Sequence, residues 1–268
     1  MRLSPFVAVA LGLGCFASCP RPAIGQVDTE ALRRKLGSLQ SDREGEHTRS
    51  ITAKLDGSLK AYGGNTDGVV WGASLQLAGR TGRHLGFFAA TGDYSHLDGE
   101  TQVRRSFAHA RYNYELSEGL WWELFGQLES NKFIAVRLRE LVGTGPRLQL
   151  FDADELQAFF GTAYMLEHTE LASDVTPPDR PALVHRSSNY LTFSWLVDER
   201  VSLVSTTYYQ PRFDEPSDYR LFSQLSADFG VATVLKAGMS LMLRYDSLPP
   251  GGVESTDWSV VNTLGLEL

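Results

Sequence analysis

The chain has 268 residues, of which 43% are hydrophobic and 21% charged, and its mean hydropathy is −0.18. This composition excludes a bundle of membrane-spanning helices, which would need several apolar runs of about 20 residues. The formal net charge of −7 argues against a nucleic-acid-binding protein, because no stripe of lysine and arginine offsets it. A transmembrane β-barrel stays compatible with this composition, since half of each strand faces a polar interior.

The first residues have the pattern of a secretory signal peptide. Arg2 provides a positive start, residues 6–17 form an apolar core, and small residues at 23 and 25 mark a cleavage site before Gln26. We therefore predict a signal peptide over residues 1–25. The alternative is a lipoprotein signal, with lipidation at Cys19.

Both cysteines, Cys15 and Cys19, lie inside this segment. The mature protein is therefore predicted to have no disulfide, no catalytic thiolate and no cysteine-ligated metal. Residues 26–49 include a short charged segment and are predicted to form a soluble periplasmic arm. Residues 50–268 are predicted to form a single barrel domain.

Alternation of apolar and polar residues runs through most of the chain and is clearest over residues 236–268. There, apolar residues from Ala237 to Tyr245 alternate with polar or small ones, and a second alternating run follows the turn at 249–252. A period of two places one set on each face of a strand. We predict strands over 51–62, 69–80, 85–95, 104–114, 120–130, 135–150, 156–168, 185–197, 201–209 and 219–231, then two more in the terminal hairpin.

The connections support an all-β, closed antiparallel transmembrane barrel of about 12 strands with both termini in the periplasm. Bacterial barrels have short turns on the periplasmic side and longer loops outside. Counted from the first predicted strand, the even-numbered connections are all compact. The odd-numbered connections include the longest one, residues 169–184, which contains three prolines.

The predicted inward face carries ionisable side chains. In a soluble ligand-binding barrel the apolar face points inward, and these groups would then be in an apolar environment at a cost of several kcal/mol each unless paired. A polar interior with lipid outside removes that cost. The predicted inward set is Lys54, Asp56, Lys60, His109, Arg111, Glu123, Glu129, Arg137, Arg139, Arg147, Arg220, Asp228, Arg244 and Asp246, with Glu140 on the opposite face.

Aromatic residues gather near the strand ends, as in the two interfacial belts of membrane barrels. Aromatic side chains favour strands of every kind, but a soluble barrel gives no reason for them to collect at the ends. The predicted outer belt is Tyr62, Trp71, Tyr94, Tyr209, Tyr219, Tyr245 and Trp258, and the inner belt is Tyr114, Trp122, Trp195 and Phe229.

Four short motifs occur in order along the predicted barrel: Gly64-Asn65-Thr66-Asp67, Arg111-Tyr112-Asn113-Tyr114-Glu115-Leu116-Ser117, Tyr219-Arg220-Leu221 and Arg244-Tyr245-Asp246-Ser247-Leu248-Pro249-Pro250-Gly251. With this order and spacing, the chain resembles a family of salt-induced outer-membrane proteins, a domain of unknown function in Gram-negative bacteria, from Ile51 to Leu268. The resemblance implies an outer-membrane barrel with a link to osmotic or salt stress, and it brings no catalytic residues.

Two groups of residues have features of chemical sites. His185 and Ser187, with Glu199 as a third member, have the spacing of an outer-membrane lipid hydrolase. However, about twelve extended residues would separate His185 from Glu199 by roughly 40 Å. Asp152, Asp154 and Glu155 lack the glycine and the further ligands of a calcium loop. We predict no catalytic, cofactor or metal site.

The sequence thus predicts a non-enzymatic outer-membrane barrel with a structural or narrow-pore role, whose lumen contains charge pairs. Its expected partners are outer-membrane lipid, lipopolysaccharide and the barrel-assembly machinery, without nucleic acid. Two alternatives stay open: a surface hydrolase of lipid acyl esters and a soluble secreted barrel that binds a ligand.

Overall fold

The computed structural model describes residues 50–153, 155–198, 200–232 and 235–266. All the regular structure in these residues is β-strand, apart from one turn of 3-10 helix, η1 (Lys132–Ile134). The strands are β1 (Ser50–Tyr62), β2 (Gly68–Thr81), β3 (His84–Leu97), β4 (Glu100–Ser117), β5 (Leu120–Asn131), β6 (Val136–Asp152), β7 (Leu156–Leu171), β8 (Leu183–Asp198), β9 (Val201–Pro211), β10 (Tyr219–Ala232), β11 (Leu235–Asp246) and β12 (Thr256–Leu266). The predicted all-β class and the twelve strands are confirmed.

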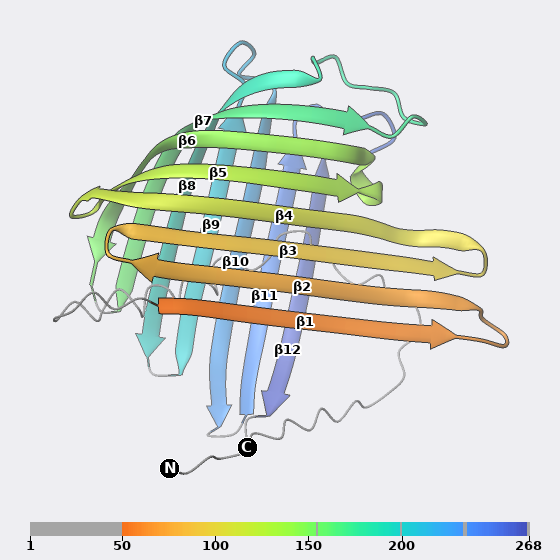
Figure 1. Ribbon diagram of the computed structural model, residues 1–268, viewed down its shortest axis with the longest axis horizontal. Coiled ribbons are helices and arrows are strands. Elements are labelled where there is room, and N and C mark those ends of the chain that lie inside the picture. Colours follow the sequence, from red (N-terminus) through yellow and green to blue (C-terminus); the bar gives the residue numbers. More distant parts are fainter. Residues whose placement is uncertain (1–49, 154, 199, 233–234, 267–268) are drawn as a thin grey trace.

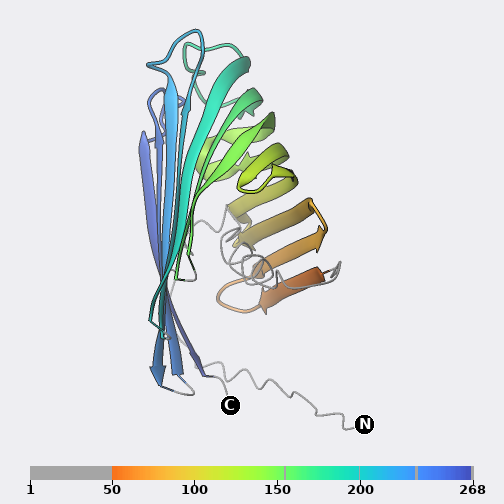
Figure 2. The ribbon, with the colours of Figure 1, turned by 90° about the vertical axis from the view of Figure 1, so that its left-hand side faces the viewer.

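The twelve strands form one antiparallel sheet in which each strand pairs with its neighbours in sequence (Figure 1). The sheet curls strongly, so that β1–β6 lie across from β8–β12 (Figure 2). The loop at 172–182 joins β7 to β8, and the loops at 212–218 and 247–255 lie at the same end of the sheet. We call this end the mouth. Among the described residues, no helix has the length and apolar composition needed to cross a membrane.

Closure of the sheet is the part of the fold prediction that the structure does not show. Pairing runs from β1 to β12 in sequence order, and no pairing between the described residues joins these two edge strands. Consequently Lys54, Asp56 and Lys60 on β1 are exposed rather than enclosed in an interior. Asp228, in the other half of the sheet, is also exposed. Lys54 and Asp56 nevertheless pair with each other at 3.2 Å.

Ionisable side chains are buried on the concave face of the curled sheet, and large apolar side chains are exposed on its outward face. On β5, Glu123 and Glu129 are 1% and 5% exposed on the concave face, whereas Leu124 and Leu128 are about half exposed on the outward face. The concave face also holds buried aromatic rings, including Phe107 on β4. A soluble ligand-binding barrel needs the opposite arrangement, so this alternative loses its structural basis.

Arg137 is the one predicted inward residue that the structure places on the wrong face. The pairing of β6 with β7 shifts register between Val136 and Leu138. This irregularity puts the Val136 side chain in the interior and leaves Arg137 exposed, where it pairs with Glu170. A bulge reverses the facing of the residues beyond it, and alternation alone does not reveal it.

The predicted aromatic belts lie on the outward face near the two ends of the sheet. At the mouth end, Tyr219 stands between Tyr209 and Tyr245, with ring centroids 5.5 Å from each. At the other end, Trp122 and Trp195 are 47% and 43% exposed. The predicted signal peptide (1–25) and periplasmic arm (26–49), together with Asp154 and Glu199, lie outside the described residues.

Candidate functional site

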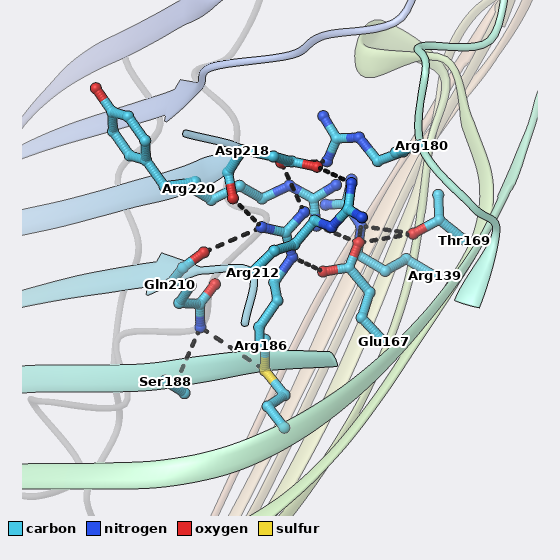
Figure 3. A network of polar contacts seen from close by, with 12 residues as sticks. Arg139, Glu167, Thr169, Arg180, Arg186, Ser188, Gln210, Arg212, Asp218 and Arg220 are labelled. Carbon is cyan, nitrogen blue, oxygen red and sulfur yellow. Dashed lines mark hydrogen bonds and ion pairs between the residues drawn. The ribbon is translucent and has the colours of Figure 1, made fainter. Parts of the chain in front are cut away.

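Ten charged side chains meet on the concave face beneath the mouth loops, and we call them the mouth network. They come from six strands and two loops, and most of them are shown in Figure 3. The members are Glu129, Arg139, Glu167, Arg180, Arg186, Arg212, Asp218, Arg220, Arg244 and Asp246. Alternation along the strands brings the strand residues to one face, and the curl of the sheet brings the strands together.

Arg186 on β8 is the most deeply buried member, with no exposed surface. Its Nε donates to Glu167 Oε2 at 3.0 Å, and its Nη2 donates to Asp218 Oδ1 at 3.0 Å. Its Nη1 donates to the backbone oxygens of Gln210 and Asp218. Because a buried guanidinium is stable only when its donors are satisfied, Arg186 fixes the positions of both carboxylates.

Glu167 on β7 is shared by three arginines. Besides Arg186, Arg220 donates to its Oε1, and the Arg139 Nε lies 3.9 Å from the same oxygen. Glu167 is 1% exposed. Three positively charged arginines thus surround the single negative charge of Glu167.

Arg180 reaches the network from the 172–182 loop rather than from a strand. Its guanidinium pairs with Asp218 Oδ1 at 3.2 Å and with Asp246 Oδ1 at 2.7 Å, and it donates to the backbone oxygen of Leu248. Gly251 N also donates to Thr176 O at 2.8 Å. These contacts tie the 172–182 loop to the β11–β12 loop across the mouth.

A second group of ion pairs crosses the interior from one half of the sheet to the other. Arg244 on β11 donates to Glu129 Oε1 on β5 at 3.1 Å. Arg139 on β6 donates to the other oxygen of Glu129 at 3.4 Å. Two arginines thus hold Glu129, and the interior is bridged at this level.

At the outer rim, Arg212 lies just beyond the end of β9. Its Nη1 donates to Asp218 Oδ2 at 3.2 Å, and its Nη2 donates to Asp214 Oδ2 at 2.5 Å. The hydrogen bond from Arg212 lowers the pKa of Asp214 below its ordinary value. The rim pair therefore stays ionised at neutral pH.

The mouth network has an excess of positive charge. It contains six arginines and four carboxylates, in a chain whose overall formal charge is −7. Asp214 adds a fifth carboxylate, but its side chain is 66% exposed at the rim. The buried part of the network thus has a formal charge of +2.

Deeper in the interior, Arg111 on β4 forms a second cluster. Its Nη1 donates to Glu123 Oε1 at 3.3 Å, and its Nη2 donates to the hydroxyl oxygen of Tyr208 at 3.3 Å. The Tyr190 hydroxyl donates to the same Glu123 oxygen at 2.5 Å. The guanidinium also lies 5.3 Å from the ring centre of Phe125 and 5.2 Å from that of Tyr190, in the range of cation–π attraction.

Two glycines make room for the aromatic rings of this cluster. Gly161 on β7 pairs with Tyr190 on β8, and a Cβ at Gly161 would lie 2.2 Å from the Tyr190 ring. Gly143 pairs with Phe125, and a Cβ there would lie 2.3 Å from that ring. The rings therefore occupy the space over these glycines that a Cβ would fill.

Two cavities follow one another along the interior. The mouth cavity has a volume of about 120 Å³ and is lined by Arg139, Arg220 and Arg244, among others. The inner cavity has a volume of about 80 Å³ and is lined by Arg111 and His109 with aromatic, amide and hydroxyl groups. Both walls include Gln127, Leu141, Gln210 and Phe222. The two cavities are therefore adjacent, and these four side chains form the constriction between them.

Half of the predicted inward charges belong to these two clusters. Arg111 pairs with Glu123 as predicted. The Arg147 guanidinium lies 3.9 Å from the ring centre of Phe159, in the range of cation–π attraction. Sequence reasoning missed Glu167, although its alternation on β7 gave a usable signal. It also missed Arg180, for which a loop sequence gives no such signal.

The structure separates the residues of the hydrolase alternative. His185 and Ser187 both lie on β8, but His185 contacts the Tyr164 hydroxyl, whereas Ser187 exchanges hydrogen bonds with Asn189 at 2.9 and 3.2 Å. No hydrogen bond joins Ser187 to His185 in the described part of the chain. A serine nucleophile needs a base within hydrogen-bond reach, so this geometry gives the hydrolase no support.

The acidic turn at 152–155, for which no calcium site is predicted, includes Asp154, which lies outside the described residues. Asp152 Oδ1 accepts a hydrogen bond from Gln157 Nε2 at 3.2 Å. Over the ranges that the structure describes, no group of three or more His, Cys, Asp or Glu side chains could hold a metal ion. The interior is therefore a site of guanidinium, amide and aromatic groups.

Comparison with protein families identifies the chain. Residues 57–267 match the family described as "Protein of unknown function, DUF481". The chain belongs to this family. The resemblance to a domain of unknown function, drawn from the four motifs, is thereby confirmed, and the family's description assigns no activity. Among curated proteins, the chain has no match.

Several solved structures are similar to the chain at low sequence identity. A "Bacterial polysaccharide outer membrane secretin" has a TM-score of 0.43 and 11% identity, with 81% of this chain and 80% of that one covered. A "KdgM porin" has a TM-score of 0.41 and 8% identity, with 82% and 99% covered. A "NanC porin" has a TM-score of 0.41 and 8% identity, with 82% and 100% covered. At these scores, the likeness says nothing of what this DUF481 chain transports or binds.

Proposed function

We propose that this DUF481 protein is an outer-membrane β-barrel whose lumen is a narrow, arginine-lined pore. The observation that carries the proposal is the separation of the two faces of the sheet. Buried ion pairs such as Arg111–Glu123 lie on the concave face, while about half of the Leu124 and Leu191 side-chain surface is exposed on the other. Lipid against the outward face would remove the free-energy cost of exposing these apolar groups to water. The polar groups would face a water-filled lumen.

In the membrane, β1 pairs with β12 in this proposal and closes the barrel. Both edge strands have unpaired backbone groups on their outer sides, and hydrocarbon would leave such groups without a hydrogen-bond partner. An even number of strands in sequence order makes β1 and β12 antiparallel, as closure requires. Cleavage of residues 1–25, the soluble arm over 26–49, and contacts with lipopolysaccharide and the assembly machinery belong to the same proposal.

The pore is narrow because side chains bridge it at two levels. Arg244 meets Glu129 across the mouth cavity, and Arg111 meets Tyr208 across the inner cavity. The two adjacent cavities supply the polar path between these bridges. The link to salt or osmotic stress implied by the motif resemblance stays a prediction.

Heat-modifiability tests the closed barrel. We expect the protein to fractionate with outer membranes and to migrate differently on a gel before and after boiling, because a closed barrel stays folded in cold detergent. Recordings in a planar lipid bilayer then test the pore, with small-conductance events as the expected result. A mobility shift without channel events would favour a plugged structural barrel, and a soluble periplasmic protein without a shift would contradict the membrane assignment.

A further inference from the structure

We propose that the interior path selects small organic anions, with the arginines of the mouth cavity attracting them and the inner cavity binding them next to Arg111. This inference rests on the proposed pore and names the class of its solute. Three observations carry it: the excess positive charge of the mouth network, the composition of the inner-cavity wall, and the four side chains that line both cavities.

The excess positive charge of the mouth network lies at the outer end of the path. Each buried carboxylate of the mouth network contacts at least two arginines, and Glu167 contacts three. A guanidinium has five N–H donors and no acceptor. Six arginines therefore offer more hydrogen-bond donors than four carboxylates can accept. Three of the arginines (Arg139, Arg220 and Arg244) line the mouth cavity itself. Rings of arginine or lysine are the usual means by which pores favour anions.

Carboxylates also line the mouth cavity, and their charges are compensated to different degrees. Glu129 is held by Arg139 and Arg244, and Asp246 is held by Arg180 and Arg220. The other two, Glu254 and Asp257, are exposed at the rim. Inside the rim, the wall of the mouth cavity therefore presents three arginines and two carboxylates, and each of these carboxylates is held by two arginines.

The inner cavity has no carboxylate in its wall. Its charged or ionisable lining consists of Arg111 and His109, and its polar lining consists of Gln127, Ser188, Thr206, Gln210 and Gln224. Arg111 is 4% exposed, and its Nε has no hydrogen-bond acceptor in the described part of the chain. Because a buried N–H without a partner is costly, this atom marks where an anionic oxygen would gain most.

The rest of the inner wall determines what kind of anion fits. Phe87, Phe107, Phe125, Tyr208 and Phe222 give the cavity flat apolar walls. Amides and hydroxyls lie between these rings. A solute with a carboxylate, a short apolar or ring-shaped body and one or two hydroxyls matches both sets of groups. A cavity of about 80 Å³ exceeds the roughly 10–15 Å³ that one water needs, so it has room for more than a single water.

Ion selectivity of the reconstituted protein tests the inference with matched variants on one strand. Arg139→Gln removes a charge that lines the mouth cavity but leaves Glu129 with Arg244 and Glu167 with two arginines. Arg137→Gln makes the same change two residues away on the outward face. We expect a reversal potential in a potassium chloride gradient that favours chloride, a preference that falls by roughly threefold in Arg139→Gln, and no change in Arg137→Gln.

A third variant tests the inner cavity. Gln224→Glu places a carboxylate in a wall that has none, without removing any arginine. We expect Gln224→Glu to lower the chloride preference further. Gln149→Glu makes the same chemical change at the end of β6 opposite the mouth, and this control should change the chloride preference little. Cation preference in the natural protein, or chloride preference unaffected by both Arg139→Gln and Gln224→Glu, would overturn the inference.

A binding measurement separates this inference from the proposed pore. If the natural protein shows no channel events, the pore is contradicted, and the anion site is then tested by the midpoint of the heat-modifiability transition. We expect benzoate to raise the midpoint of the natural protein more than benzamide does at equal ionic strength, and to lose this advantage in Gln224→Glu. Equal effects of benzoate and benzamide would overturn the anion site.

Discussion

At the residue scale, the Gly161–Tyr190 pair explains how large rings fit in a narrow interior. The missing Cβ of Gly161 lets the Tyr190 ring lie flat across the strand pair. This position brings the Tyr190 hydroxyl to Glu123 and its ring face to Arg111. One glycine therefore supports the hydrogen bonding of a buried carboxylate and the stacking of a buried guanidinium.

We predict that Gly161→Ala lowers the free energy of unfolding by about 1–3 kcal/mol, because its Cβ would overlap the Tyr190 ring. Tyr190→Ala should remove most of this cost, since no ring then occupies the space. Urea unfolding of both single variants and the double variant in vesicles measures the coupling. Additive losses would show that the two residues do not interfere with each other.

Tyr190→Phe gives a second prediction at this scale. The ring and its contact with Arg111 are kept, but Glu123 loses the hydrogen bond at 2.5 Å. A buried charged group that loses a donor costs about 1–3 kcal/mol. Tyr164→Phe, at an exposed tyrosine, is the matched control and should cost less. Similar losses in the two variants would contradict the importance of the buried contact.

At the element scale, the 172–182 loop forms part of the mouth rather than a free surface loop. Arg180 contributes a guanidinium that is 7% exposed, and the loop backbone bonds to Gly251. Three prolines in this loop (Pro177, Pro178 and Pro181) limit its conformations. This lowers the conformational entropy that is lost when the loop is held in place. The loop is therefore held against the mouth network and the β11–β12 loop.

Arg180→Gln should loosen this loop, because a neutral side chain cannot replace two ion pairs. The described residues contain no cysteine, so a spin label at Ser173→Cys would report loop motion without interference. We expect sharper spectral lines in Arg180→Gln and unchanged lines in Arg137→Gln, whose arginine lies outside the mouth network. Unchanged lines in both variants would show that Arg180 does not hold the loop.

Alternation predicted the strands well, because a sheet with one apolar and one polar face repeats every two residues. Predicted and observed ends agree closely for β5 and β9, while β4 and β7 extend further than predicted. The position of Arg137 could not be predicted, since the bulge before Leu138 depends on pairing with β7. Arg180 was also beyond prediction, because the curl of the whole sheet decides which loop reaches Asp218.

At the scale of the whole molecule, the apolar outward face predicts that lipid rather than water surrounds the protein, and this can be tested. Leu191 lies midway along β8, and Val197 lies near its end; they are 48% and 42% exposed. In water, a charge at either position would be tolerated equally. In a bilayer, the two positions would lie at different depths.

We therefore predict unequal costs for arginine at the two positions. Leu191→Arg should lower the free energy of unfolding in vesicles by about 2–4 kcal/mol, and Val197→Arg by about 0–1 kcal/mol, because the cost of a cation falls towards the membrane surface. Urea titration of the two variants in lipid measures both values. Equal and small losses would contradict a lipid-facing surface.

The sequential order of the strands has a consequence for how the chain acquires its structure. Every strand pair joins neighbours in the chain, so the sheet can grow one hairpin at a time with short loop closures. The contact between Glu129 and Arg244 spans 115 residues and becomes possible only when β11 has been added. Before that, the ion pair of Glu129 with Arg139 on the adjacent strand can already form. The late arrival of the last strands thus completes both the wall and the charge balance of the interior, which links correct assembly to a working lumen.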